Sequence, residues 1–194
     1  MDSKEILISE YIEGSILTKK ELQKNHIPEI ARIADVIIEA YLQGHKVVWF
    51  GNGGSAADAQ HLACELVSRF YFKRKALASI ALTTNTSELT AIANDYSFNQ
   101  VFARQVEALV NPGDVVIGIS TSGNSPNVVE GIKKAKQLGA ITIAFTGSKE
   151  GALTQEVDYL LKVPSDTTPH IQESHIMIGH IICYLVEKAL FQTA

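Results

Sequence analysis

Five short apolar runs alternate with stretches of helical periodicity along most of this sequence of 194 residues. We predict them as β-strands at residues 46–50, 79–82, 115–119, 141–145 and 159–163. Strands that alternate with helices favour parallel pairing, with helices on both faces of the sheet. The sequence therefore predicts a doubly wound, flavodoxin-like α/β fold, with a five-stranded parallel sheet in the order 2-1-3-4-5.

Helical periodicity also precedes and follows these strands. Two extra N-terminal helices are predicted within residues 3–43, the second beginning beside Pro28 and ending at Gly44. A last helix is predicted from about Pro169 to Leu190, with apolar residues on more than one side, which favours burial against another subunit as well as the sheet. We expect residues 1–194 to form one domain, with helices 3–43 packing at an oligomer interface.

Charge and composition narrow the range of partners. The net charge is -4, from 17 Lys+Arg against 21 Asp+Glu, and the absence of a long basic run argues against nucleic-acid binding. No run reaches the ~20 apolar residues of a membrane span, and residues 1–5 do not resemble a secretory signal. We expect a cytoplasmic protein with no membrane partner, and no disulfide between Cys64 and Cys183, which both fall in predicted helices.

Two loops rich in glycine and serine follow the first and third predicted strands, at residues 51–55 and 120–125. Each precedes a predicted helix, whose first N–H groups and positive dipole end attract an anion. Strands one and three are neighbours in the predicted order, so both loops meet at the edge where open α/β sheets bind ligands. We interpret them as a phosphate cradle, although glycine and serine are also common in ordinary turns.

Two other readings of the loops fit less well. Gly51, Gly53 and Ala56 satisfy a loose dinucleotide-binding fingerprint, but residues 83–85 (Thr-Thr-Asn) lack the acidic ribose ligand that should follow the second strand. Neither loop has the lysine of a P-loop.

Candidate chemistry lies on two predicted helices. His61 and Glu65 are one turn apart after the first loop, a spacing that suits a metal or proton transfer but is also common on a solvated face. The last helix contributes Gln172, Glu173, His175 and His180, of which His180 lies among isoleucines, as core histidines often do. Two His-x-x-Cys pairs, ending in Cys64 and Cys183, are alternative zinc ligands, and spacing alone does not separate Glu65 from Cys64.

Four motifs in order resemble the phosphoheptose (sedoheptulose-7-phosphate) isomerases of the sugar isomerase (SIS) domain superfamily, over nearly the whole chain. They are Gly51-Asn52-Gly53-Gly54-Ser55-x-x-Asp58-x-x-His61-x-x-x-Glu65, Ala93-Asn94-Asp95, Gly118-Ile119 followed by residues 120–125, and Ile171-Gln172-Glu173-x-His175. The resemblance implies an aldose-ketose isomerase that converts sedoheptulose 7-phosphate to D-glycero-D-manno-heptose 7-phosphate, the first step towards ADP-heptose and the lipopolysaccharide core. It also implies a cytoplasmic homotetramer, with one Zn²⁺ per active site and active sites at subunit interfaces.

Carried over by position, the resemblance implies three groups of site residues. Catalysis would fall to Glu65 as base and His180 as acid. The zinc ligands would be His61, Glu65, Gln172 and His180. Substrate contacts would come from Asn52, Gly53, Gly54, Ser55, Glu65, Asn94, Asp95, Ser120, Thr121, Ser122, Ser125 and Gln172.

Two points do not fit this pattern simply. Gln172 and His180 are about 12 Å apart along a straight helix at ~1.5 Å per residue, so they share one ion only by reaching towards each other or by coming from different subunits. His170 stands where the family pattern has arginine, which removes any anion contact of that arginine. A non-catalytic SIS scaffold, such as a replication-initiator-associating protein, is the alternative function, but a scaffold has no need for His61, Glu65, Gln172 and His180 in one crevice.

Overall fold

The computed structural model describes residues 3–192 and contains a five-stranded parallel sheet in the predicted order, β2-β1-β3-β4-β5. The strands are β1 (Val47–Gly51), β2 (Ser79–Ala81), β3 (Val115–Ile119), β4 (Ile141–Thr146) and β5 (Tyr159–Lys162). Each lies within one or two residues of the predicted position. The doubly wound α/β prediction is therefore confirmed.

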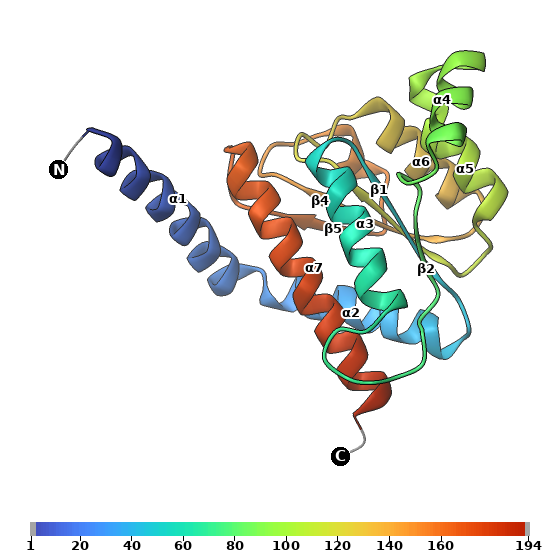
Figure 1. Ribbon diagram of the computed structural model, residues 1–194, viewed down its shortest axis with the longest axis horizontal. Helices are drawn as coiled ribbons and strands as arrows, with labels where there is room; N and C mark the ends of the chain where they lie inside the picture. Colours follow the sequence, from blue (N-terminus) through green and yellow to red (C-terminus); the bar gives the residue numbers. More distant parts are fainter. Residues whose placement is uncertain (1–2, 193–194) are drawn as a thin grey trace.

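Helices cover both faces of the sheet (Figure 1). They are α1 (Ser3–Asn25), α2 (Ile27–Leu42), α3 (Gly54–Val67), α4 (Thr86–Asp95), α5 (Val101–Leu109), α6 (Pro126–Gln137) and α7 (Thr168–Phe191), with short 3-10 helices η1 (Phe98–Gln100) and η2 (Ala152–Gln155). Val47 and Trp49 of β1 pack with α2, α3 and α7, whereas Val48 and Phe50 pack with α5 and α6. Two apolar cores thus form, one on each face, because successive strand residues point to opposite sides.

Helices α3 and α7 lie side by side and run in the same direction (Figure 1). Gly54 at the start of α3 meets Gln172, and Leu62, two turns later, meets Gly179. A Cβ on Gly179 would stand 2.4 Å from the side chain of Leu62, so a glycine is what allows the two helices to approach this closely. Successive turns of α3 therefore lie beside successive turns of α7, so side chains of the two helices meet along the contact.

Helix α1 projects away from the sheet (Figure 1). Most of its large apolar side chains are exposed: Ile6, Leu7, Ile8, Tyr11, Ile12, Ile16 and Leu17. Its contacts with α7 include hydrogen bonds from Ser15 and Lys19 to Glu173 and an edge-on contact of Tyr11 with His170. Exposed apolar side chains gathered on one helix are typical of a surface for protein association.

Helix α7 is the one helix among residues 3–192 that is long and apolar enough for a membrane span by composition. Its apolar residues Ile171, Ile178, Ile182 and Val186 are buried in the core beside the sheet. Packing against α2 and α3 therefore accounts for its hydropathy.

Candidate active site

The two glycine- and serine-rich loops lie side by side at the carboxyl edge of the sheet. Gly51, the last residue of β1, is in register with Ile119, the last residue of β3. The chain then turns into α3 through Gly53, whose φ of +55° disfavours any residue with a Cβ. The predicted meeting of the two loops is confirmed.

Three hydroxyl groups cluster in the second loop. Oγ of Ser120 lies 2.9 Å from Oγ of Ser125 and 3.3 Å from Oγ of Ser122. Ser125 is the N-cap residue of α6, yet within residues 3–192 its side chain makes no capping hydrogen bond. Its hydroxyl contacts Ser120 instead. Hydroxyl donors and the N-terminus of α6 are therefore available together to a ligand.

Two more helices begin beside these hydroxyls. The N-cap of α3 is Gly53, which has no side chain, and the N-cap of α7 is Thr167, whose side chain makes no capping hydrogen bond in the described part of the chain. A small cavity of ≈ 140 Å³ lies beside the second loop, lined by Thr121 and Ser122 and by residues near the start of α7. Three positive helix ends at one crevice favour an anion there.

Asn52 and Gln172 border the first loop. The amides of Asn52 and Asn127 donate to each other at 2.8 Å in both directions, which ties the first loop to α6. A Cβ on Gly54 would lie 2.7 Å from Nε2 of Gln172, so the Gln172 amide sits directly over the start of α3. Ser55 is buried beneath the same turn.

His61, Glu65 and His180 come together where α3 and α7 pass each other. Nε2 of His61 lies 2.9 Å from Nε2 of His180 and 3.1 Å from Oε1 of Glu65, and the three donor atoms lie within 4.8 Å of one another. Burial lowers the pKa of His180, and the neighbouring His61 lowers it further. The charge of Glu65 acts to raise this pKa but does not outweigh them. His180 is thus kept neutral, the form in which imidazole accepts a proton or binds a metal.

The same three residues fit a zinc ion. Two imidazole nitrogens and a carboxylate oxygen are typical zinc donors, and tetrahedral zinc with bonds of ~2.0–2.1 Å holds neighbouring donors about 3.3 Å apart. Nε2 of His61 lies close to that separation from both other donor atoms, at 2.9 Å and 3.1 Å, and all three donor atoms lie within 4.8 Å of one another. Three protein ligands leave one position of a tetrahedral site open to a further ligand.

Neither cysteine joins this cluster. Cys64 is exposed and unpaired, and Cys183 is a buried free thiol whose pKa burial raises to about 12. A thiol with such a pKa is a poor metal ligand because the thiolate is the binding form. The structure thus favours Glu65 over Cys64, an alternative that residue spacing left open.

Two groups of predicted substrate residues lie apart from the cluster. Gln172 precedes His180 by eight residues and faces Gly54, about 12 Å along the helix from the histidines. Asn94 and Asp95 are exposed at the end of α4, where the Asn94 amide donates to Asp95 at 2.9 Å. Helix α4 has no buried residue within the described chain and contacts η1 and α5.

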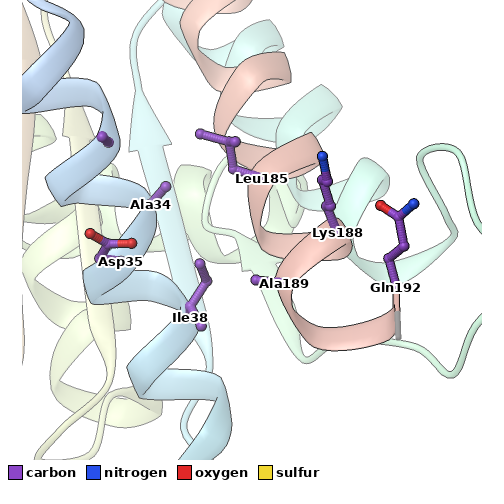
Figure 2. Close-up of a pocket in the computed structure, with 8 residues that line it drawn as sticks. Ala34, Asp35, Ile38, Leu185, Lys188, Ala189 and Gln192 are labelled. Atoms are coloured by element: carbon purple, nitrogen blue, oxygen red, sulfur yellow. The ribbon is translucent and has the colours of Figure 1, made fainter. Parts of the chain in front are cut away.

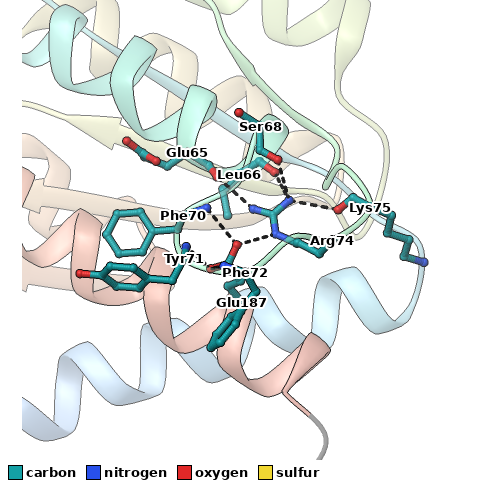
Figure 3. A network of polar contacts seen from close by, with 9 residues as sticks. All are labelled: Glu65, Leu66, Ser68, Phe70, Tyr71, Phe72, Arg74, Lys75 and Glu187. Atoms are coloured by element: carbon teal, nitrogen blue, oxygen red, sulfur yellow. Dashed lines mark hydrogen bonds and ion pairs between the residues drawn. The ribbon is translucent and has the colours of Figure 1, made fainter.

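A buried ion pair closes the other end of the α3–α7 contact (Figure 3). Nε of Arg74 donates to Glu187 at 2.8 Å, and the backbone N–H groups of residues 70–72 donate to the same carboxylate. Arg74 also donates to the carbonyl of Glu65, at 2.9 Å. Burial by itself would raise the pKa of Glu187, but these hydrogen bonds outweigh it and lower that pKa. The network anchors the end of the helix that carries Glu65.

His170 does not reach the crevice with its ring. It is buried against α1, where a Cβ on Gly14 would lie 2.7 Å from its Cε1, and its Nε2 has no hydrogen-bond partner within residues 3–192. The residue at the position where the family pattern has arginine therefore serves the α1–α7 contact.

A groove of ≈ 640 Å³ between α2 and α7 lies far from this chemistry (Figure 2). Its lining includes Ala34, Ile38, Leu185 and Ala189. Ala189 follows Gln172 by 17 residues of α7, about 25 Å along the helix. The groove is therefore separate from the phosphate crevice.

The sequence and the fold of this chain are similar to those of known proteins. The chain matches the SIS domain family over residues 10–147. It is 53% identical over 186 residues to a phosphoheptose isomerase of Clostridium acetobutylicum, covering 95% of both chains. The chain belongs to the phosphoheptose isomerase family. Solved phosphoheptose isomerases from Francisella tularensis (TM-score 0.93, 38% identity, 97% of this chain and 100% of that one) and Neisseria gonorrhoeae (0.91, 40%, 96% and 100%) have the same fold.

As a phosphoheptose isomerase family member, the chain is an aldose-ketose isomerase.

The sequence alone indicated no role for Asn127, which pairs with Asn52, or for the buried Arg74–Glu187 pair. Asp58 stands within a motif, but the sequence indicated no role for it. Charged and amide side chains are common on surfaces, and no spacing rule marked these as buried or paired.

Proposed function

We propose that this chain interconverts sedoheptulose 7-phosphate and D-glycero-D-manno-heptose 7-phosphate, at the start of ADP-heptose synthesis for the lipopolysaccharide core. The observation that carries the proposal is the placement of His61, Glu65 and His180 on the same helix pair whose first turns border the phosphate cradle. His61 follows Gly54 by seven residues, about 10 Å along α3. That distance is comparable with an extended seven-carbon chain.

The cradle holds the phosphate end of the sugar. Hydroxyls of Ser55, Ser120, Thr121, Ser122 and Ser125 and the N–H groups of residues 52–54 bind the anion, and Gln172 contacts the sugar beside Gly54. Binding energy gained at the phosphate then orients C1 and C2 at the reactive cluster.

Proton transfer is assigned to two side chains. Glu65 takes a proton from C1 of the ketose and returns it at C2, while His180 moves a proton from O1 to O2. A neutral His180 suits this role because it accepts one proton and then gives it up. Oε1 of Glu65 and Nε2 of His180 both lie beside Nε2 of His61. The base and the proton shuttle therefore face the same substrate carbons.

Zinc is the proposed metal, held by His61, Glu65 and His180. The family pattern adds Gln172, which another subunit would supply, because Gln172 of the same chain lies about 12 Å along α7 from His180. When bound, zinc polarises the sugar oxygens as a Lewis acid. Since a carboxylate bound to a cation is a weaker base, binding the metal and acting as the base would compete at Glu65.

The proposed assembly is a cytoplasmic homotetramer whose active sites lie at subunit interfaces. The exposed apolar side chains of α1 support this, because a second copy would bury them. The separation of Gln172, Asn94 and Asp95 from the His61 cluster of the same chain supports it as well, because another subunit can bring such residues to the site. The domain arrangement proposed here is one SIS domain over residues 1–194, with helices 3–43 at the interface.

The test is direct. Purified protein is incubated with sedoheptulose 7-phosphate, with and without a chelator, and the aldose is followed by NMR. We expect conversion that the chelator abolishes and added zinc restores. No conversion in the zinc-loaded protein would favour a non-catalytic scaffold.

A further inference from the structure

Asp58 holds a buried carboxylate oxygen that the described chain leaves unused. Its Oδ2 is shielded from solvent and has no hydrogen-bond partner among residues 3–192. Burial raises the pKa of Asp58 to about 6, with His61 pulling the other way. An unpaired buried carboxylate is costly, so its presence calls for a partner supplied in the working protein.

The position of Asp58 on α3 indicates that partner. Asp58 precedes His61 by three residues and Glu65 by seven, so all three lie on one face of the helix. Helical side chains lean towards the N-terminus, which brings each over the preceding turn. Glu65 accordingly reaches back to His61 at 3.1 Å. The same lean directs the side chain of His61 towards the turn that carries Asp58, and the charge of His61 acts on the Asp58 carboxyl.

The two nitrogens of His61 have different surroundings. Nε2 faces both His180 and Glu65, so it is the nitrogen that would bind the metal. A neutral imidazole that binds through Nε2 carries its proton on Nδ1, which is then a hydrogen-bond donor. Metal-binding histidines commonly donate that second N–H to a carboxylate, which fixes the ring and raises its basicity.

We propose that Asp58 is a positioning residue, whose carboxylate accepts the Nδ1–H of His61 and holds the ring for metal binding. The inference rests on the zinc site of the proposed function. This hydrogen bond would satisfy the buried Oδ2 of Asp58 and the remaining nitrogen of His61 together.

The test measures zinc affinity by chelator competition, without substrate. We expect Asp58→Asn, which keeps the shape and loses the charge, to weaken zinc binding about 10-fold, and Asp58→Ala about 100-fold. Asp35→Asn is the matched control, because Asp35 is exposed on α2 at the distant groove (Figure 2). Its zinc affinity should equal that of the wild type.

Thermal unfolding of the metal-free proteins separates positioning from folding. We expect metal-free Asp58→Asn to be at least as stable as the wild type, because the change removes an unpaired buried charge. Zinc affinity within twofold of wild type in both Asp58 variants would overturn the proposal, and so would an affinity loss matched by destabilisation of the metal-free fold. Unchanged zinc affinity with a raised KM would assign Asp58 to the sugar instead. Isomerase activity of zinc-loaded wild type, measured in parallel, reports on the proposed function alone.

Discussion

Helices α3 and α7 meet in two polar clusters that differ in how completely their groups are satisfied. At one end, Arg74 and Glu187 are 1% and 0% exposed, and the Glu187 carboxylate accepts four hydrogen bonds. Between the helices nearer the cradle, His61 is about half exposed and shares its Nε2 with His180 and Glu65. The first cluster is closed to solvent, and the second still has capacity to bind a ligand.

The difference separates structure from chemistry on a single helix pair. A closed, fully bonded ion pair fixes geometry, since removing either partner leaves a buried charge behind. An open cluster, whose donor atoms face one another and remain partly exposed, can gain free energy by binding a metal or a substrate. Arg74 links the two, because it donates both to Glu187 and to the backbone carbonyl of Glu65.

Glu65→Gln should have the largest effect on activity. Removing the proposed base lowers kcat by roughly 10²–10⁴-fold, the usual contribution of a general base. The melting temperature should stay near that of wild type, because Glu65 belongs to the open cluster. Steady-state kinetics and thermal unfolding check both, and a kcat within threefold of wild type would remove Glu65 from the mechanism.

Glu187→Gln should show the opposite pattern. We expect a loss of about 3–5 kcal/mol in the free energy of unfolding, because Arg74 is left buried without its counter-charge. Denaturant titration measures this. A single variant as stable as wild type would mean that the pair anchors nothing.

A buried histidine of α7 extends the comparison to the effect of pH on stability. His175 is fully buried with its Nε2 3.1 Å from the carbonyl of Thr146, and burial lowers its pKa to about 4 despite that bond. Below pH ~6.5 the unfolded chain binds a proton at this histidine, whereas the folded chain binds it only near pH 4. The free energy of unfolding therefore decreases as the pH is lowered from about 6.5 to 4, by about 3 kcal/mol.

Denaturant titration of the metal-free protein at several pH values measures this slope. His175→Gln should be less dependent on pH between about 6.5 and 4 than wild type, whatever its absolute stability. Equal slopes in the two proteins would show that His175 takes up its proton in the folded state.

Ser120→Ala should have the smallest effect. It removes one hydroxyl from the serine cluster and should raise KM for the sugar phosphate about 10-fold, with kcat changed little, since one hydrogen bond to a charged group contributes about 1.5 kcal/mol. Competition by inorganic phosphate should weaken by the same factor. A variant with lower kcat and unchanged phosphate inhibition would move Ser120 out of the cradle.

The strand order and the meeting of the two loops were predictable because fully buried parallel strands read as continuous apolar runs. Helix periodicity likewise placed His61 one turn before Glu65. The partnership of His61 with His180 was not predictable from spacing, because it depends on α3 and α7 running parallel in contact at Gly179. Glu187 resembled an ordinary surface charge, and only the folded loop 70–74 reveals its partners.

The central claim is that an anion held at the two loops places the other end of a sugar at the open cluster. Its most direct test compares kcat/KM of the zinc-loaded protein for sedoheptulose 7-phosphate and for sedoheptulose without the phosphate. We predict a loss of roughly 10³-fold without the phosphate, the equivalent of two to three charge-assisted hydrogen bonds of about 1.5–3 kcal/mol each. Equal values for the two sugars would contradict the account.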